Sequence, residues 1–450
     1  MFYNLCIIHV EDYMKKNTNN LILLKHLIQL TCFFIFSLIS VISFSCSYEE
    51  VVIYSPVYMS YEEMRSPVKS VIEPQEVTNA GKIYYYDPYL LINEVEKGIH
   101  FYDNTNPSTP VYLGMVAIIG NIDMAVRDGV LYADNYVDLL ALDISGLPDL
   151  NTVTTLKRLE KVLYFVSSAG RDDSDLNQTT YSENIDDSKG VVIRWDRKVE
   201  TRITSDMQTG YMRGFGGMMA TDAMAENVQT GQGGSMAKFT IYKNFLYTIV
   251  GEKALQLFNI EIPANPVLFS NINIGINIET IYPYAEKELL FIGAQNGMYI
   301  YSVEDPSNPQ FKSRFLHVRS FDPVVAQGDF AYVTLRAGNW NGSQNELEVI
   351  DISNIIKPEL KKTVSMQGPY GLGILNNSLF VCDGTAGLKL YDISKIPDVT
   401  FIKQIGDFET YDVIPVSASL IMVTGPEELR QYSIDTSNDL NQLSTITIKK

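Results

Sequence analysis

The chain has 450 residues, and 53 Asp and Glu against 35 Lys and Arg leave it a formal net charge of −18. This acidic balance argues against a surface that tracks nucleic-acid phosphates, so we expect no nucleic-acid partner. Three of the four cysteines lie in or beside an apolar N-terminal segment and only four histidines are present, which leaves neither a disulfide framework nor a Cys/His metal cluster elsewhere.

The N-terminal segment has the pattern of a secretory signal. Residues 27–45 are almost wholly apolar, and Lys15 and Lys16 supply a basic flank upstream. We therefore expect residues 1–45 to form a signal peptide. Counted from Met1 this signal is unusually long, whereas a signal that begins at Met14 has an ordinary length.

The apolar segment ends in Ser43-Phe44-Ser45-Cys46, which resembles the cleavage box of a bacterial lipoprotein. In such a protein the cysteine becomes the lipid-modified N-terminus. We therefore expect Cys46 to anchor the chain in a membrane and residues 46–80 to form a tether. A plain transmembrane anchor and an ordinary cleaved signal are the alternatives. Because Ser47-Tyr48-Glu49-Glu50 resembles the acidic export signal of some surface lipoproteins, the expected location is the outer face of the bacterial outer membrane.

From residue 81 onward one phrase recurs along the chain. Its clearest copy runs from Gly387 to Pro397, where an alternating strand ends at an Asp, turns through Ser and leaves the turn at Pro. Equivalent anchor positions are 103, 143, 259, 302, 351, 392 and 433. Their spacing is about 41 residues apart from one long gap, and this period is typical of four-stranded propeller blades.

Within the sixth copy, four short segments of strand character are separated by turn residues at 376–377, 383–385 and 392–397. One such unit has open edges and too small a core, so the units must stack around a common axis. We therefore predict an all-β protein in which residues 81–450 form a β-propeller, with seven four-stranded blades. The long gap is an insertion at residues 167–235, in which Gly190–Asp196 leaves an eighth, degenerate blade open.

The Asp at the end of each phrase has a structural explanation. An Asp followed two residues later by Ser accepts local hydrogen bonds and closes a turn. Repeated calcium sites are the alternative, although Asn259 and Ser302 in place of Asp argue against a shared metal ligand. We predict no other cofactor.

Candidate binding residues follow from the propeller geometry. The positions that would converge on the axis follow the first strand of each unit, and they include Asp123, Glu279, Asp322 and Asp412. Together they would form an acidic mouth of the central channel. We identify no catalytic residue, because the sequence lacks both a P-loop lysine and a Gly-x-Ser-x-Gly elbow.

Several copies of the phrase resemble the LVIVD-repeat family of bacterial surface proteins, among them Gly98–Asn104, Val137–Ser145 and Gly387–Ser394. The resemblance covers residues 81 to 440 apart from the insertion. It implies a propeller built from repeats of about 40 residues. It implies no particular activity and no catalytic residue.

The sequence is compatible with three functions. The first is a non-enzymatic surface lipoprotein whose propeller binds a protein or a glycan, and the scarcity of His favours it. The second is a propeller enzyme, a hydrolase or lyase, with an axial acidic or metal-dependent site. The third is a structural protein of the cell envelope.

Overall fold

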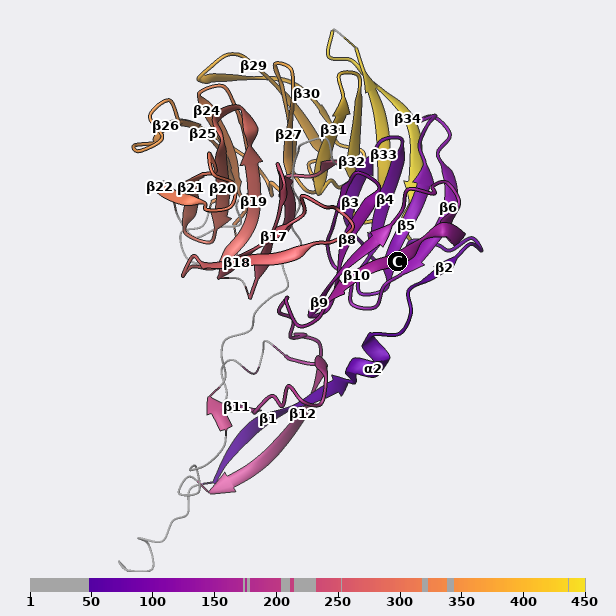
Figure 1. Ribbon diagram of the computed structural model, residues 1–450. Coiled ribbons are helices and arrows are strands. Elements are labelled where there is room, and N and C mark those ends of the chain that lie inside the picture. The colour runs from indigo at the N-terminus through magenta and orange to yellow at the C-terminus, as the bar shows by residue number, and fades with distance from the viewer. Residues whose placement is uncertain are drawn as a thin grey trace, which may run out of the picture. The chain divides into compact units, whose positions relative to one another are not determined.

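The computed structural model describes residues 48–172, 175, 179–203, 211–213, 232–251, 253–317, 323–337, 344–435 and 437–449. The chain divides into two compact units. The smaller unit comprises residues up to 56, 170–185 and 195–217, and the larger unit comprises residues 57–169, 186–194 and 218–450. The predicted signal peptide and Cys46 lie outside the described residues. Figure 1 labels the strands of both units.

The smaller unit is built on one sheet with the strand order β12-β1-β11-β13. Its strands are β1 (Tyr48–Met59), β11 (Thr179–Glu183), β12 (Val191–Ile203) and β13 (Tyr211–Arg213). β1 and β11 run parallel, with Val51 opposite Thr179. Most of Gly190–Asp196, the candidate for an eighth blade, thus lies in β12 of this sheet.

A polar cluster holds the smaller unit together. The Asp175 carboxylate accepts a hydrogen bond from the Tyr54 hydroxyl at 2.5 Å and two from Arg197, both at 2.7 Å. The Arg171 guanidinium lies 4.0 Å from the centre of the Trp195 ring. The ion pair lowers the pKa of Asp175, chiefly through the hydrogen bonds from Arg197.

The larger unit contains antiparallel sheets that follow one another along the chain, six with four strands and one with six among the described residues. We name them first to seventh in chain order. The first consists of β3 (Ala80–Tyr86), β4 (Tyr89–Glu94), β5 (Gly98–Asp103) and β6 (Val111–Ala117), with β2 (Lys69–Val71) and β14 (Gln232–Gly233) added at its edges. The second consists of β7 (Met124–Arg127), β8 (Val130–Asn135), β9 (Asp138–Asp143) and β10 (Thr154–Leu159), and the third of β15 (Phe239–Tyr242), β16 (Phe245–Val250), β17 (Ala254–Asn259) and β18 (Val267–Asn273). The fourth consists of β19 (Ile278–Tyr284), β20 (Leu289–Ala294), β21 (Gly297–Ser302) and β22 (Gln310–Leu316), and the fifth of β23 (Val324–Gln327), β24 (Phe330–Leu335), β25 (Glu346–Asp351) and β26 (Glu359–Ser365). The sixth consists of β27 (Leu372–Leu375), β28 (Ser378–Cys382), β29 (Leu388–Lys395) and β30 (Asp398–Ile405), and the seventh of β31 (Asp412–Ser417), β32 (Leu420–Thr424), β33 (Glu428–Ile434) and β34 (Leu440–Thr447).

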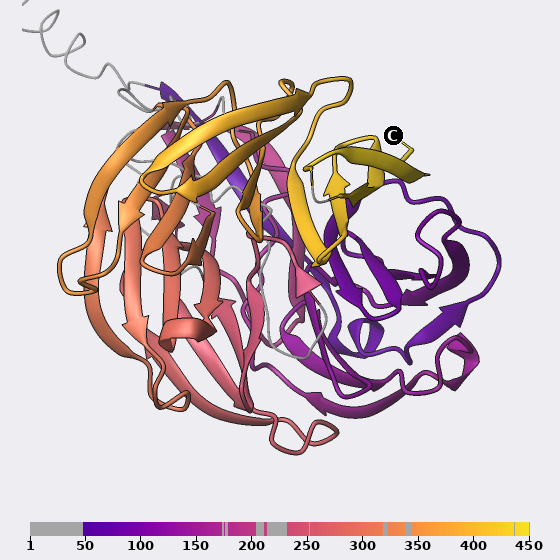
Figure 2. The same ribbon diagram turned by 90° about the horizontal axis from the view of Figure 1, so that it is seen from above.

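Successive sheets meet through their innermost strands. β3 contacts β7, and the contacts continue through β15, β19, β23, β27 and β31. Figure 2 shows the sheets following one another around the larger unit in the order of the chain. The first and last sheets are linked through β14, which pairs with β3 and contacts β31, and through a bridge between Val77 and Ile448. The predicted all-β, propeller-type fold is therefore confirmed.

Helical structure is confined to short turns among the described residues. These are α2 (Tyr61–Met64), η1 (Leu150–Thr152) and η4 (Ala285–Lys287). Ser60 caps α2, since its hydroxyl accepts the Glu63 N–H at 3.1 Å. No helix of the described chain is long and apolar enough to cross a membrane.

The Asp of the repeated phrase closes a turn at the end of the third strand of a sheet. Asp143 Oδ1 accepts the Ser145 N–H at 2.9 Å and the Ser145 hydroxyl at 2.6 Å. Asp103, Asp351 and Asp392 make the same turn with the Thr or Ser two residues later. Asn259 takes this role in the third sheet, where its Oδ1 accepts the Glu261 N–H at 2.8 Å. The structural explanation of this Asp is confirmed.

The fourth strand of each repeat carries a β-bulge at the same place, and this strand is the outermost one in every sheet of the larger unit except the first, where β2 pairs with β6. The ladder between the third and fourth strands skips one residue in every sheet of the larger unit. The skipped residues are Leu113, Leu156, Phe269, Lys312, Lys361, Ile402 and Leu443. Bulges twist an edge strand away from regular pairing, so these edges are less open to extension by another strand.

Neighbouring sheets share a repeated pair of core positions. The first position lies two residues before the last residue of the phrase strand, as Phe101 lies before Asp103. The second position directly follows that last residue in the next sheet, as Ile144 follows Asp143. Six interfaces place an apolar pair in one core cluster: Phe101 with Ile144, Ala141 with Ile260, Leu257 with Val303, Ile300 with Ile352, Val349 with Ile393, and Leu390 with Ile434. Between the seventh and first sheets the same positions hold Gln431 and Asn104, both buried.

Candidate functional site

The predicted axial carboxylates are enclosed rather than exposed. Asp123 directly precedes β7, Glu279 lies in β19 and Asp412 begins β31, so these residues stand at the start of the first strands and not after them as expected. Their side chains are 3%, 6% and 1% exposed. Asp322 lies outside the described residues.

Asp123 joins the second sheet to the third. Its Oδ1 accepts the Met124 N–H at 2.7 Å, and its Oδ2 accepts the N–H groups of Lys238 and Phe239 at 2.8 and 3.1 Å. Burial raises the pKa of Asp123, while the positive charge of Lys82 and these hydrogen bonds oppose the shift. The carboxylate thus holds the entry of β15 against β7.

Asp412 sits between two glycines. Its Oδ1 accepts the Val413 N–H at 3.0 Å and the Ser235 hydroxyl at 3.3 Å, and its Oδ2 makes no well-formed hydrogen bond among the described residues. A Cβ atom on Gly234 would lie 1.5 Å from Oδ2, and one on Gly371 would lie 1.8 Å from Oδ1. Burial raises the pKa of Asp412 to about 7.

Lys82 supplies a buried cation between these carboxyl groups. Its Nζ donates to the Met236 carbonyl at 2.9 Å, and its charge lowers the pKa of both Asp123 and Asp412. Sequence reasoning did not select Lys82. The available signal was a charged residue near the start of an otherwise apolar and aromatic strand, in Gly81-Lys82-Ile83.

Residues 232–237, which we call the axial segment, connect several sheets. Gln232 and Gly233 pair with Tyr85 and Tyr84 of β3. The Ser235 hydroxyl accepts the Leu372 N–H of the sixth sheet at 2.9 Å. The Ala237 carbonyl accepts the Ile281 N–H of the fourth sheet at 3.1 Å. The end of the predicted insertion therefore lies among the innermost strands, beside the residues predicted to form an axial mouth.

Two other titratable groups of the larger unit, Cys382 and His100, are buried and have surroundings that fit a structural role. Cys382 is buried in β28, and burial raises the pKa of its thiol well above the usual value, which makes it unreactive. Burial lowers the pKa of His100, whose ring nitrogens lie 3.4 Å from Glu94 and 3.1 Å from the Tyr112 hydroxyl. Within the described residues, no group of three or more His, Cys, Asp or Glu could hold a metal ion. Calcium binding stays a prediction.

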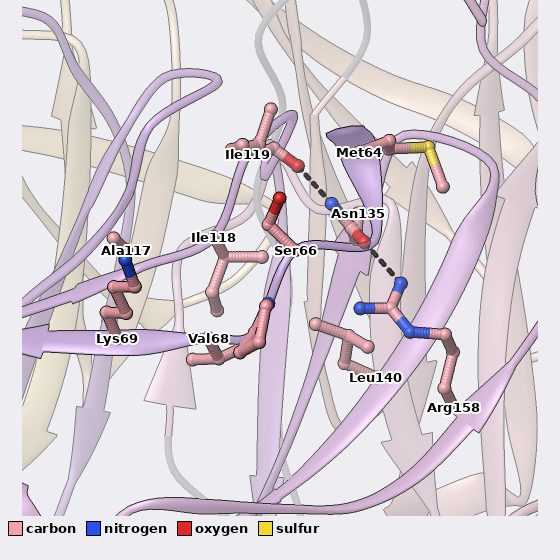
Figure 3. Close-up of a pocket in the computed structure, with 11 residues that line it drawn as sticks. Met64, Ser66, Val68, Lys69, Ala117, Ile118, Ile119, Asn135, Leu140 and Arg158 are labelled. Carbon is pink, nitrogen blue, oxygen red and sulfur yellow. Dashed lines mark hydrogen bonds between the residues drawn. The ribbon is translucent and has the colours of Figure 1, made fainter. Parts of the chain in front are cut away.

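A cavity of about 170 Å³ lies between the segment Met64–Lys69 and the first two sheets. Figure 3 shows Val68 and Ile118 on one side and Leu140 and Arg158 on the other. The polar groups at one end are already engaged, because Asn135 donates to the Ile119 carbonyl and accepts from Arg158. Ligand pockets usually measure about 300–1,000 Å³, so this cavity is too small for most ligands.

Arg65 and Arg158 converge on Asp138 beside this cavity. Arg65 donates to both Asp138 oxygens at 2.8 and 3.1 Å, and Arg158 donates to Oδ2 at 3.0 Å. The Asp138 side chain is fully buried. This ion cluster ties the chain after α2 to the second sheet.

Four consecutive sheets carry a large exposed apolar residue at one position of their outermost strand, directly before the bulge. These residues, which we call the edge belt, are Leu268, Phe311, Leu360 and Phe401, with exposed fractions of 41%, 54%, 44% and 53%. Phe311 and Phe401 make edge-to-face contacts with Tyr301 and Tyr391 opposite them. The second and seventh sheets have Thr155 and Gln442 at this position. The belt therefore covers only part of the circumference.

Comparison with solved structures finds the same fold at low identity. The chain is similar to a protein from Lactobacillus plantarum with a TM-score of 0.52 and 12% identity over 82% of this chain and 97% of that chain. It is also similar to a protein from Bacteroides fragilis described as a candidate 6-phosphogluconolactonase, with a TM-score of 0.50 and 9% identity over 84% of this chain and 98% of that one. Identities this low show the fold alone. No curated protein matches the chain.

A family model identifies the repeat. Residues 319–365, which include all four strands of the fifth sheet, match the model described as LVIVD repeat. The resemblance read from the phrases of the sequence is thus confirmed, and the chain carries the LVIVD repeat.

Proposed function

We propose that this protein is a non-catalytic binding scaffold whose edge belt takes a protein partner. The observation that carries the proposal is the recurrence of an exposed large apolar side chain at one position in four consecutive sheets. Repeated apolar exposure is costly in water and marks interaction surfaces. Aliphatic Leu268 and Leu360 alternate with Phe311 and Phe401, and this mixture suits a protein surface better than a glycan, which would favour aromatic rings throughout.

The sheets of the larger unit act, in this proposal, as seven blades of one closed ring. The innermost strands contact one another in chain order, and β14, the Val77–Ile448 bridge and the Asn104–Gln431 pair link the last sheet to the first. A closed ring gives the edge belt a rigid support. It also leaves no place for an eighth blade, because β12 pairs with β1.

The proposed location is the outer face of the bacterial outer membrane, where a lipid on Cys46 would anchor the protein. Metabolic labelling with a fatty acid tests the anchor. Label should enter the full chain and be lost in Cys46→Ala, whereas label retained in that variant would contradict it. Protease treatment of intact cells tests exposure at the surface.

The binding proposal is tested with the full chain as bait against a detergent extract of the native cell envelope and against a glycan array. The double variant Phe311→Ser/Phe401→Ser should lose a captured protein by at least about tenfold, a free-energy change of about 1.4 kcal/mol. Val111→Ser is the matched control, since Val111 is 58% exposed on the first sheet but stands outside the belt. Equal losses in both variants, or capture by glycans alone, would contradict the proposal. Metal analysis of the same sample tests bound calcium.

A second candidate is a propeller enzyme with an axial acid. The pKa of about 7 at Asp412 favours it, because a general acid or base works best near the ambient pH. Turnover of lactones or glycosides by the full chain, abolished in Asp412→Asn, would support it. Binding through the edge belt without such turnover would support the scaffold.

A further inference from the structure

We infer that the axial end of the larger unit is a binding groove for an extended peptide, and that the axial segment occupies this groove as the chain's own ligand. The inference is independent of the edge belt, because the two features involve opposite ends of the strand order within each sheet.

The axial segment is additional to the repeats. Every sheet of the larger unit has its own four consecutive strands without β14, which is an extra strand beside β3. The segment arrives from the insertion between the second and third sheets. Each sheet has its four strands without the segment, so the segment can be treated as an added occupant, which also contributes to the link between the first and last sheets.

The segment is held both by its main chain and by the side chains of Met236 and Ala237, which are buried in a core cluster of the larger unit. Its residues 232 and 233 pair with β3, its Met236 carbonyl accepts from Lys82, and its Ala237 carbonyl accepts from the Ile281 N–H. Peptide recognition by strand addition relies on such main-chain hydrogen bonds, which do not depend on the sequence of the ligand. The groove therefore offers the same main-chain contacts to another extended peptide that also fills the places of Met236 and Ala237.

Two positions add sequence selectivity. Gly234 faces the Asp412 carboxylate so closely that a Cβ atom there would overlap Oδ2. Ser235 follows, and its hydroxyl accepts the Leu372 N–H and donates to Asp412 Oδ1. The groove thus selects an extended peptide with glycine followed by a small hydroxyl residue.

The resident segment leaves one strong acceptor unused. Asp412 Oδ2 is buried and makes no well-formed hydrogen bond among the described residues, although the Ser235 main chain lies close enough to help lower the pKa of Asp412. An unpaired buried carboxylate oxygen is costly, and the raised pKa of Asp412 reflects the same burial. A peptide that brought a donor to Oδ2 would therefore compete with the resident segment.

The test uses a fluorescent peptide with the sequence of residues 232–238, Gln-Gly-Gly-Ser-Met-Ala-Lys, and the full chain. In Gly234→Ala the resident segment can no longer sit against Asp412, so the groove is vacated. The peptide should bind this variant at least about tenfold more tightly than the wild type, whose groove is occupied. A control peptide with Ala at the place of Gly234 should bind neither protein.

Equal peptide binding to the wild type and a folded Gly234→Ala protein would overturn the inference, as would equal binding of the control peptide. If Gly234→Ala does not fold, Ser235→Ala replaces it, since it removes only the hydroxyl contacts. Hydrogen exchange of the wild type gives a second measurement. The Leu372 amide should exchange through local opening, at least about tenfold faster than the Leu390 amide of β29. Equal exchange at the rate of global unfolding would show that the segment is not displaceable.

Discussion

The side-chain amides of Asn104 and Gln431 are paired with each other across 327 residues of sequence. Asn104 Nδ2 donates to Gln431 Oε1 at 2.9 Å, and Gln431 Nε2 donates to Asn104 Oδ1 at 2.7 Å. The six other interfaces have apolar residues at these two positions. A polar pair at one interface alone marks where the first and last sheets meet, because neither amide is satisfied against an apolar neighbour.

This pair gives the first prediction. Asn104→Ile or Gln431→Leu alone leaves a buried amide without its partner, so each should lower the free energy of unfolding by about 1–3 kcal/mol. The double variant reproduces the apolar pair of the other interfaces and should recover most of the loss. Urea denaturation of the four proteins forms a double-mutant cycle. A double variant as unstable as the sum of the singles would show that the two amides act separately.

Gly371 and Gly368 provide a matched pair of substitutions in one loop. A Cβ atom on Gly371 would overlap Asp412, whereas one on Gly368 meets nothing within 4 Å. Gly371→Ala should therefore lower the free energy of unfolding by at least about 2 kcal/mol, as overpacking of a dense interior does. Gly368→Ala should change it by less than about 0.5 kcal/mol. Thermal unfolding followed by circular dichroism measures both, and similar effects would refute the packing around Asp412.

Asp412 also predicts how stability depends on pH. Its pKa rises from 3.8 to about 7 on folding, so the folded protein retains a proton that the unfolded chain releases above about pH 4. The contribution of this group is fully present below pH 3.8 and is lost as the pH rises to about 7. Asp412→Asn should flatten the fall in stability between pH 5 and pH 7, measured by urea denaturation at each pH.

Asp134 contributes to the same pH dependence, because burial raises its pKa to about 7 as well. Burial also raises the pKa of Asp123, so the wild-type slope has at least three contributors and Asp412→Asn should remove only part of it. An unchanged slope in Asp412→Asn would mean that Asp412 is ionised in the folded protein throughout this range.

Substitutions at Asp143 distinguish a turn-closing role of the phrase Asp from a calcium-binding role. Asp143→Ala removes hydrogen bonds to the Ser145 N–H and hydroxyl and should cost about 1 kcal/mol of unfolding free energy. Asp143→Asn should cost less, since Asn259 closes the same turn in the third sheet. A metal chelator should leave the melting temperature of the wild type unchanged. A lower melting temperature with chelator would support calcium instead.

The ion cluster at Asp138 yields a final prediction. Asp138→Ala leaves the guanidinium groups of Arg65 and Arg158 without their shared carboxylate and should cost about 3 kcal/mol, the low end for breaking a buried ion pair, because both Arg side chains still reach water. Glu76→Gln breaks an ion pair with Lys449 in which both partners are exposed, and it should cost less than about 1 kcal/mol. Equal losses would show that the buried cluster adds nothing to stability.

Local features of this protein could be predicted because they depend on neighbours in the chain. Alternating apolar residues favour a strand, and an Asp two residues before a Ser closes a turn, so the repeats and their boundaries follow from residues such as Asp143 and Asp392. The predicted axial residues were placed at equivalent points of the innermost strands for the same reason. The burial of Asp412 did not follow from the repeat, since Asp412 packs against Gly234 and Ser235, which belong to no repeat.

The sequence by itself determined the repeat, the strands within it, the turn at each phrase and the resemblance to the LVIVD repeat. Only the tertiary structure decided that Asn104 meets Gln431, that Lys82 lies between Asp123 and Asp412, and that the axial segment lies against Gly371 and Asp412. The physical reason is distance along the chain. Periodicity and turn chemistry act over a few residues, whereas these relationships bring together residues between 41 and 330 positions apart, and they form only when the sheets are packed around one another.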